Sequence, residues 1–358
     1  MRRFPYERLK KVHLTERALS DFNKMQASPV FPRSTRQSTE KKTRAYDSNF
    51  EQLLSDAGFV GDWDIDTQQP LNMEELKRML RNEPIACSEM EYRTFTRQLS
   101  RARNESKTRA VLFPLLGGGE DGQYAHEEEL LCHNLEPLVP GIADAKPDYM
   151  DGALASSMKK EVRQSLSQQI VPANLSMPIL PNFFLEVKGP DGSYLVLRRQ
   201  VLHDGCLGAR GMRSLNSWGK EESFNGKAST ISVSFFLGIL QIYCTHPVQQ
   251  KEGTAFHTNQ IGNYYLNKDP ESLAEGLTAF RNARAWAKHQ RDAAISEINS
   301  RLDYDSSSAT LASSSSDSAT VGPLQQQAPS TNNNSQENLK KRGLPAGGKE
   351  NRPKRRKN

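Results

Sequence analysis

Residues 182–189 read Asn182-Phe183-Phe184-Leu185-Glu186-Val187-Lys188-Gly189, an apolar run that contains one acid and one lysine. Proline and glycine flank the run, so the pattern predicts a short strand buried in a sheet. Because side chains alternate across a strand, Phe183 and Val187 are expected on one face, and Glu186 and Lys188 on the other. Burying a carboxylate and an ammonium is costly unless they are paired or bind a ligand. This strand is therefore the first candidate for a functional site.

Helices and further strands are expected on both sides of this strand. The expected helices cover residues 73–81, 88–113, 154–170, 194–215 and 270–302. The other expected strands cover residues 135–139, 142–149, 230–236, 238–245 and 255–261. Ser88 is expected to cap the second helix, with Glu91 at the capping-box position, and Pro114 is expected to end it. Helices beside a mixed sheet indicate an α/β or α+β fold.

The composition divides the 358 residues into three regions. Residues 1–44 form a basic segment with one expected helix, Glu7–Met25, and residues 45–302 hold all three tryptophans and most of the apolar clusters. Residues 303–358 are rich in Ser, Gln and Asn, so we expect this tail to be disordered. No apolar run approaches the roughly 20 residues that a membrane-spanning helix needs, and no membrane partner is expected.

Charge is distributed unevenly along the chain. Residues 1–44 carry 12 Lys/Arg and 4 Asp/Glu, a net of +8, and residues 337–358 carry 9 and 2, a net of +7. The stretch between them holds 27 basic and 36 acidic residues, a net of −9. Basic ends on an acidic body indicate tails that contact nucleic acid or a transport receptor.

The C-terminal tail carries two basic clusters about ten residues apart, Lys340-Lys341-Arg342 and Lys354-Arg355-Arg356-Lys357. Their spacing resembles a bipartite nuclear import signal, in which an extended peptide places two charge clusters in acidic grooves of a receptor. The sequence therefore predicts an import receptor as a partner and a nuclear location. The alternative is a solvated basic tail that binds no import receptor.

The pairing of Glu186 with Lys188 has a chemical interpretation. Acid-x-lysine triplets recur in any charged chain, but only this one is embedded in a dense apolar run. A magnesium ion takes carboxylate ligands, and a lysine beside the ion can orient a water or contact a phosphate. The alternative is an ion pair at a strand edge that binds no metal.

A second acid extends this pattern. Asp148 follows Pro147 near the end of another expected strand, and together with Glu186-Val187-Lys188 the chain resembles the PD-(D/E)XK nuclease superfamily. The resemblance implies a restriction-endonuclease-like mixed sheet flanked by helices. It also implies that Asp148 and Glu186 hold Mg²⁺ or Mn²⁺, and that Lys188 assists the attack of water on a phosphodiester. Gln200, on the following helix, is placed to orient water or phosphate.

Two parts of that assignment have alternatives. Between Asp148 and Glu186 lie 37 residues that include an expected helix, so Asp144 and Asp151 are substitutes for the first metal ligand. An acid on the preceding helix sometimes contributes in this superfamily, and Glu105 is the candidate here.

A nearer resemblance covers most of residues 45–300. The stretches 183–192 and 207–212, together with Asp204-Gly205, resemble an uncharacterised family of fungal proteins, which implies no activity. The site residues therefore carry the functional expectation, which is a metal-dependent phosphodiesterase that acts on or binds DNA or RNA. The alternative is a non-catalytic interaction module of the same fold.

Two basic helix faces fit a phosphate-rich ligand. They consist of Arg93, Arg97 and Arg101, and of Arg281, Arg284, Lys288 and Arg291. Each phosphate that they neutralise would steepen the salt dependence of binding. For any single stripe of this kind, a solvated helix face is the alternative.

Overall fold

The computed structural model describes residues 42–64, 67–119, 121–220, 224–251 and 253–314. The helix expected at Glu7–Met25, the Ser/Gln/Asn-rich stretch after residue 314 and both basic clusters of the tail lie outside the described residues. The chain divides into a compact unit, Met1–Ser306, and a second unit that begins at Ser307. The sheet and the cavity belong to the first unit. Among the described residues, no helix is both long and apolar enough to cross a membrane.

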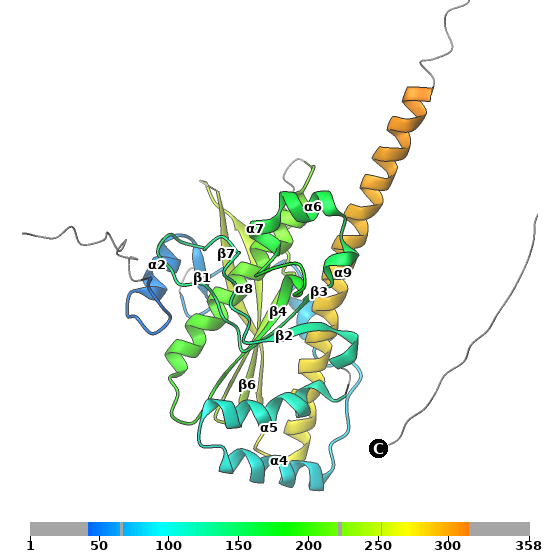
Figure 1. Cartoon of the computed structure of the whole chain (residues 1–358). Helices are drawn as coiled ribbons and strands as arrows, with labels where there is room; N and C mark the ends of the chain where they lie inside the picture. The colour runs from blue at the N-terminus through cyan, green and yellow to red at the C-terminus, as the bar shows by residue number, and fades with distance from the viewer. Residues whose placement is uncertain (1–41, 65–66, 120, 221–223, 252, 315–358) are drawn as a thin grey trace, which may run out of the picture. The chain divides into compact units, whose positions relative to one another are not determined.

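A seven-stranded mixed sheet forms the centre of this unit (Figure 1). Its strands are β1 (Phe59–Gly61), β2 (Ala125–Glu128), β3 (Tyr149–Ala153), β4 (Ile179–Lys188), β5 (Thr230–Phe236), β6 (Ile239–Gln249) and β7 (Thr254–Tyr265). They lie in the order β1-β7-β6-β5-β4-β3-β2. The pairs β1–β7 and β4–β5 are parallel, and the other neighbours are antiparallel. The mixed α/β architecture expected from the sequence is confirmed.

Helices cover both faces of the sheet. The α-helices are α2 (Phe50–Asp56), α3 (Met73–Met79), α4 (Glu89–Arg101), α5 (Glu105–Gly117), α6 (Lys160–Ser165), α7 (Ser167–Ile170), α8 (Tyr194–Ser217) and α9 (Pro270–Ser314). Helix α8 packs along β4, β5, β6 and β7, while α5 and α9 contribute to the core on the opposite face. The central strands are therefore shielded from water on both sides.

Strand β4 has the face assignment that its alternation predicts. All ten of its residues are buried. Phe183, Leu185 and Val187 join the core cluster that contains α9, whereas Phe184 joins the cluster that contains α8 residues. Glu186 and Lys188 share the second face, so they lie under the cover of α8 rather than at an exposed sheet edge.

The helix expected at residues 88–113 is two helices. Ser88 caps α4 through the expected capping box with Glu91. The chain then leaves the helical conformation at Ala102, and the side chain of Asn104 accepts a hydrogen bond from the Lys107 N–H to start α5. Pro114 lies inside α5 and does not end it. The N-cap residue Asn104 therefore divides the segment into two helices, although the helical sequence pattern continues through it.

The chain between α5 and β4 also departs from expectation. Residues 135–139 form no strand, because Pro137 and Pro140 lack the N–H that a strand ladder requires. Strand β3 begins only at Tyr149, so Asp148 lies just before a strand and not near the end of one. The expected helix at 154–170 is a 3₁₀ turn (Ala155–Ser157) followed by α6 and α7. The sequence pattern did not predict β2.

Candidate functional site

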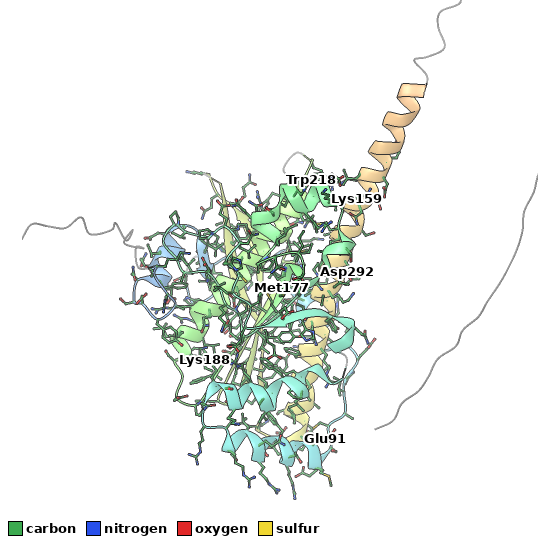
Figure 2. All side chains as sticks on the ribbon, in the orientation of Figure 1. Glu91, Lys159, Met177, Lys188, Trp218 and Asp292 are labelled. Carbon is green, nitrogen blue, oxygen red and sulfur yellow. The ribbon has the colours of Figure 1, made fainter. Side chains whose placement is uncertain are left out.

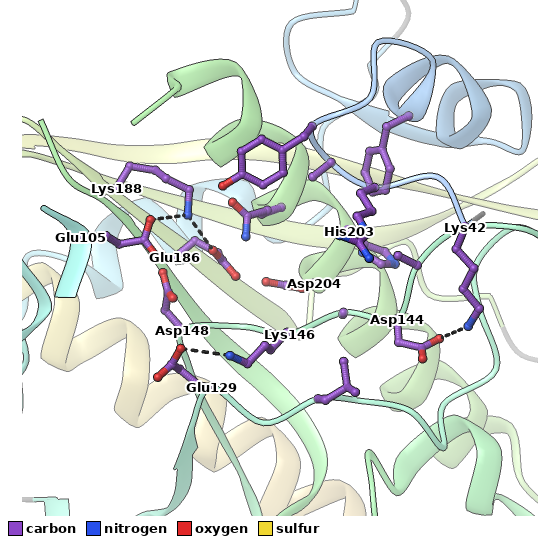
Figure 3. Close-up of a pocket in the computed structure, with 18 residues that line it drawn as sticks. Lys42, Glu105, Glu129, Asp144, Lys146, Asp148, Glu186, Lys188, His203 and Asp204 are labelled. Atoms are coloured by element: carbon purple, nitrogen blue, oxygen red, sulfur yellow. Dashed lines mark hydrogen bonds and ion pairs between the residues drawn. The ribbon is translucent and has the colours of Figure 1, made fainter. Parts of the chain in front are cut away.

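A cavity of about 760 Å³ opens where strand β4 ends beneath helix α8 (Figure 3). Strand β4 contributes Glu186 and Lys188 to its lining, and α8 contributes Gln200, His203 and Asp204. The loop before β3 and the segment from residue 42 to residue 50 complete the walls. Segments that are far apart in the sequence therefore meet at one polar cavity.

Lys188 lies at the end of β4 among densely packed side chains (Figure 2). It is 4% exposed, and its Nζ lies 3.0 Å from Glu105 Oε2 and 3.9 Å from Glu186 Oε2. Burial alone would lower the pKa of this lysine, but the carboxylates of Glu186, Asp148 and Glu105 outweigh burial and raise the pKa. Lys188 is consequently a cation at neutral pH.

Gly189 explains how Glu105 reaches Lys188. A Cβ atom added at Gly189 would lie 2.5 Å from the backbone nitrogen of Glu105 and 2.6 Å from the carbonyl carbon of Asn104. Only a glycine therefore allows the N-terminus of α5 to approach the end of β4 this closely. The approach places the first side chain of α5 beside the lysine.

Asp148 is fixed by two contacts. Its Oδ1 lies 3.0 Å from Arg109 Nη1, and its Oδ2 accepts a hydrogen bond of 2.8 Å from the Val187 N–H. The neighbouring residue Tyr149 pairs with Leu185, which brings Asp148 beside Glu186. Burial raises the pKa of Asp148, and the nearby Lys188 opposes this rise.

Glu186 and Asp204 form a buried carboxyl pair. Glu186 is 1% exposed and Asp204 is 2% exposed, and their side chains lie within hydrogen-bonding reach of each other. Burial and the neighbouring acids raise the pKa of Glu186 well above its ordinary value, and burial raises the pKa of Asp204 to about 7. Because the two carboxyl groups lie so close together, the charge on one affects the protonation of the other.

Three oxygen atoms in this cavity accept no hydrogen bond from the described residues. Glu186 Oε2, Asp204 Oδ2 and Gln200 Oε1 are buried and have no hydrogen-bond partner within the part of the chain that the structure describes. Over the same residues, no group of three His, Cys, Asp or Glu side chains is placed to hold a metal. The unpartnered atoms are instead two carboxylate oxygens and one amide oxygen, all of them ligand types that Mg²⁺ and Mn²⁺ accept.

The structure brings together the residues that the sequence singled out. Asp148, Glu186, Lys188 and Gln200 all line the cavity. Of the substitutes for Asp148, Asp144 lines the cavity but pairs with Lys42 at 2.7 Å.

The other substitute, Asp151, is not among the cavity-lining residues. It pairs with Arg284 at 2.6 Å under helix α9. Asp151 is thus part of the contact between β3 and α9, and it makes no contribution to the cavity.

The sequence reasoning did not assign Asp204 to the site. Asp204 follows Gln200 by four residues, so both project from the same face of α8. That spacing, in a helix with a nearly continuous apolar stretch around it, is the sequence signal that could have indicated Asp204. The superfamily pattern places its acids on strands, so it does not indicate an acid on helix α8, which covers those strands.

One basic stripe has an internal role. Arg284 and Arg291 of α9 are buried, and they contact Asp151 on β3 and Asn182 on β4. These two side chains therefore hold α9 against the sheet and are not available to phosphate. Arg93, Arg97 and Arg101 lie exposed on α4 and remain candidates for contact with nucleic acid.

The fold and the cavity define the class of protein, an α/β domain with a buried cluster of carboxylates around one lysine. A family model described as a domain of unknown function (DUF7924) matches residues 90–299, and the chain belongs to this family. The match includes Asp148, Glu186, Lys188, Gln200 and Asp204 but not residues 42–50, which form one cavity wall. No curated protein matches the chain.

Proposed function

We propose that the cavity is the active site of a metal-dependent phosphodiesterase that hydrolyses nucleic acid, either DNA or RNA. The observation that carries the proposal is a buried, cationic Lys188 that shares the cavity with carboxylate and amide oxygens, and these oxygens accept no hydrogen bond from the described residues. Structural ion pairs normally satisfy their own hydrogen bonds, so unpartnered buried oxygens favour a site that takes up a cation.

The resemblance to the PD-(D/E)XK superfamily supports the same reaction. Strand β4 carries the Glu186-x-Lys188 pattern, and Asp148 lies beside Glu186, although it lies just before strand β3 and not on it. Gln200 lies on the helix after the Glu-x-Lys strand, and Glu105 lies on a preceding helix. On this resemblance, Asp148 and Glu186 hold the ion.

Each residue of the cavity has its own role in the proposed reaction. When it is bound, Mg²⁺ or Mn²⁺ supplies Lewis-acid stabilisation of the charge that develops on the phosphate. Lys188 is charged, so it acts as a hydrogen-bond donor to the attacking water or to a phosphate oxygen, and not as a base. Glu105 holds the ammonium group in place. The resemblance alone implies that Gln200 orients water or phosphate.

Substitution of Lys188 tests the proposal. We expect Lys188→Ala to lower metal-dependent cleavage of plasmid DNA or of a labelled RNA by about 100-fold or more, the usual effect of removing one such donor. Binding of the same nucleic acid, measured by gel shift without metal, is expected to change less than twofold. Lys77→Ala, which removes a half-buried lysine on α3 that does not line the cavity, is the matched control and should cleave normally.

The alternative function, a non-catalytic interaction module, gives a different result. If the purified wild-type protein cleaves neither DNA nor RNA with Mg²⁺ or Mn²⁺, the hydrolase assignment is wrong. In that case, the Glu186–Lys188 contact serves only to stabilise the end of β4.

A further inference from the structure

The distribution of hydrogen bonds in the cavity is uneven. Asp148 uses both oxygens within the protein, and Glu105 contacts Lys188. By contrast, Glu186 Oε2 and Asp204 Oδ2 are buried without a hydrogen-bond partner among the described residues. Unpaired buried oxygens of this kind are costly, so the Glu186–Asp204 side of the cavity is the part of the site that lacks a ligand.

Close packing of α8 on the sheet creates this side of the cavity. A Cβ atom added at Gly208 would lie 2.6 Å from the Phe184 ring, and one added at Gly205 would lie 2.5 Å from Thr245 Oγ1. The helix backbone therefore lies directly on the strands. Consequently Asp204 reaches the level of Glu186 on β4, one turn after Gln200 on the same helix face.

The charges of the inner cluster do not balance. Four carboxyl groups surround the centre of the cavity: Glu105, Asp148, Glu186 and Asp204. They face two cationic side chains, Lys188 and Arg109. When all four acids are ionised, two negative charges remain, which is the charge that one divalent cation neutralises.

We propose that Glu186, Asp204 and Gln200 together bind one divalent cation, Mg²⁺ or Mn²⁺, between strand β4 and helix α8. The proposal refines the metal site of the proposed phosphodiesterase and rests on that function for its biological meaning. It makes Asp204 a metal ligand that the strand motif does not contain. It also gives Asp148 a positioning role, since Arg109 and the Val187 N–H already hold that carboxylate.

The test uses the full chain and the metal alone. Isothermal titration with MnCl₂, repeated with MgCl₂ and without nucleic acid, is expected to show one site in the wild-type protein. Asp204→Asn is expected to weaken Mn²⁺ binding at least tenfold, because it removes one anionic ligand. Glu129→Gln is the matched control, because Glu129 lines the same cavity but is half exposed and pairs with Lys146 and Arg109, and it should bind within twofold of wild type.

A second comparison separates the two carboxylates. Asp148→Asn should lose less affinity for Mn²⁺ than Asp204→Asn does. Circular dichroism and thermal melting of each metal-free variant check that it folds. If Asp204→Asn does not fold, Gln200→Ala provides the measurement, with an expected loss of threefold or more.

The outcomes distinguish this inference from the proposed function. A wild-type protein that takes up no Mn²⁺, or an Asp204→Asn variant with wild-type affinity, overturns the inference even if the protein cleaves nucleic acid. Uptake of Mn²⁺ that depends on Asp204, without any cleavage, sustains the inference and overturns the phosphodiesterase assignment.

Discussion

At the scale of single residues, burial sets the charge of several side chains outside the cavity. His246 on β6 is 2% exposed, and its ring lies 6.0 Å from the ring of His257 on β7. The Gln68 N–H donates to His257 Nδ1, so that nitrogen is an acceptor. Burial, with His257 as a further cause, lowers the pKa of His246 to about 4. Both rings are therefore neutral in the folded protein at neutral pH.

The low pKa of the buried His246 predicts that the folded protein loses stability in acid. The unfolded chain protonates His246 below about pH 6.5, whereas the folded protein resists protonation down to about pH 4, so stability falls as the pH drops through this window. His246→Gln removes the contribution and is expected to reduce the loss between pH 7.5 and pH 4.5 by roughly 2–3 kcal/mol. Urea unfolding at pH 7.5 and pH 4.5 measures the free energy of unfolding. Equal losses of this free energy in the variant and the wild type would contradict the prediction.

The sequence predicted some of the residues that line the cavity. Alternation in the run around Glu186 placed its side chain and that of Lys188 together, because the period of two is a property of any strand. Asp204 was not assigned, because its place beside Glu186 arises only when α8 lies over β4 and only its spacing from Gln200 indicates it in the sequence. Asp148 was singled out by the superfamily pattern, but the pattern did not indicate that Arg109 and the Val187 N–H would occupy its oxygens.

At the scale of elements, the approach of α8 to the sheet is the feature that builds the cavity. Gly208 shows how close this approach is, since an added Cβ would lie 2.6 Å from the Phe184 ring and 2.9 Å from Pro181 O. The carbonyl oxygen belongs to the backbone and has little freedom to move. An enlarged side chain here must therefore displace the helix or strain the strand.

The expected cost of Gly208→Ala is about 1–2 kcal/mol of unfolding free energy, because strain from overpacking exceeds the gain in helix propensity. Gly122→Ala is the control, since no atom lies within 4 Å of its added Cβ, and it should stay within about 0.5 kcal/mol of wild type. Chemical denaturation of both variants measures the difference. Equal stabilities would show that α8 is free to shift away from β4.

Elements with a clear local signal were predictable. The hairpin of β5 and β6, helix α8 and the start of α9 fall close to their expected places, because apolar periodicity determines them locally. Helix α9 continues to Ser314, so the prediction that it ends at residue 302 and that residues 303–314 are disordered was wrong. The inward role of Arg284 and Arg291 on α9 was not predictable. Their partners, Asp151 and Asn182, lie more than 100 residues away in the sequence.

At the scale of the whole molecule, the cavity depends on more of the chain than the family match covers. Arg199 of α8 is buried and donates to the carbonyl oxygens of Ala45 and Asp47. Arg198 and Arg199 also contact Glu51 at the start of α2. These contacts hold the segment before α2 as a wall of the cavity, although the family match begins at residue 90. We infer that residues 42–50 contribute to what the cavity admits.

The central claim is that the oxygens beside Lys188 bind a divalent cation, and anomalous diffraction from crystals grown with Mn²⁺ tests it most directly. The account predicts one anomalous peak in the cavity, about 2 Å from oxygens of Glu186 and Asp204. A cavity without a peak, in crystals with several millimolar Mn²⁺, would contradict the claim.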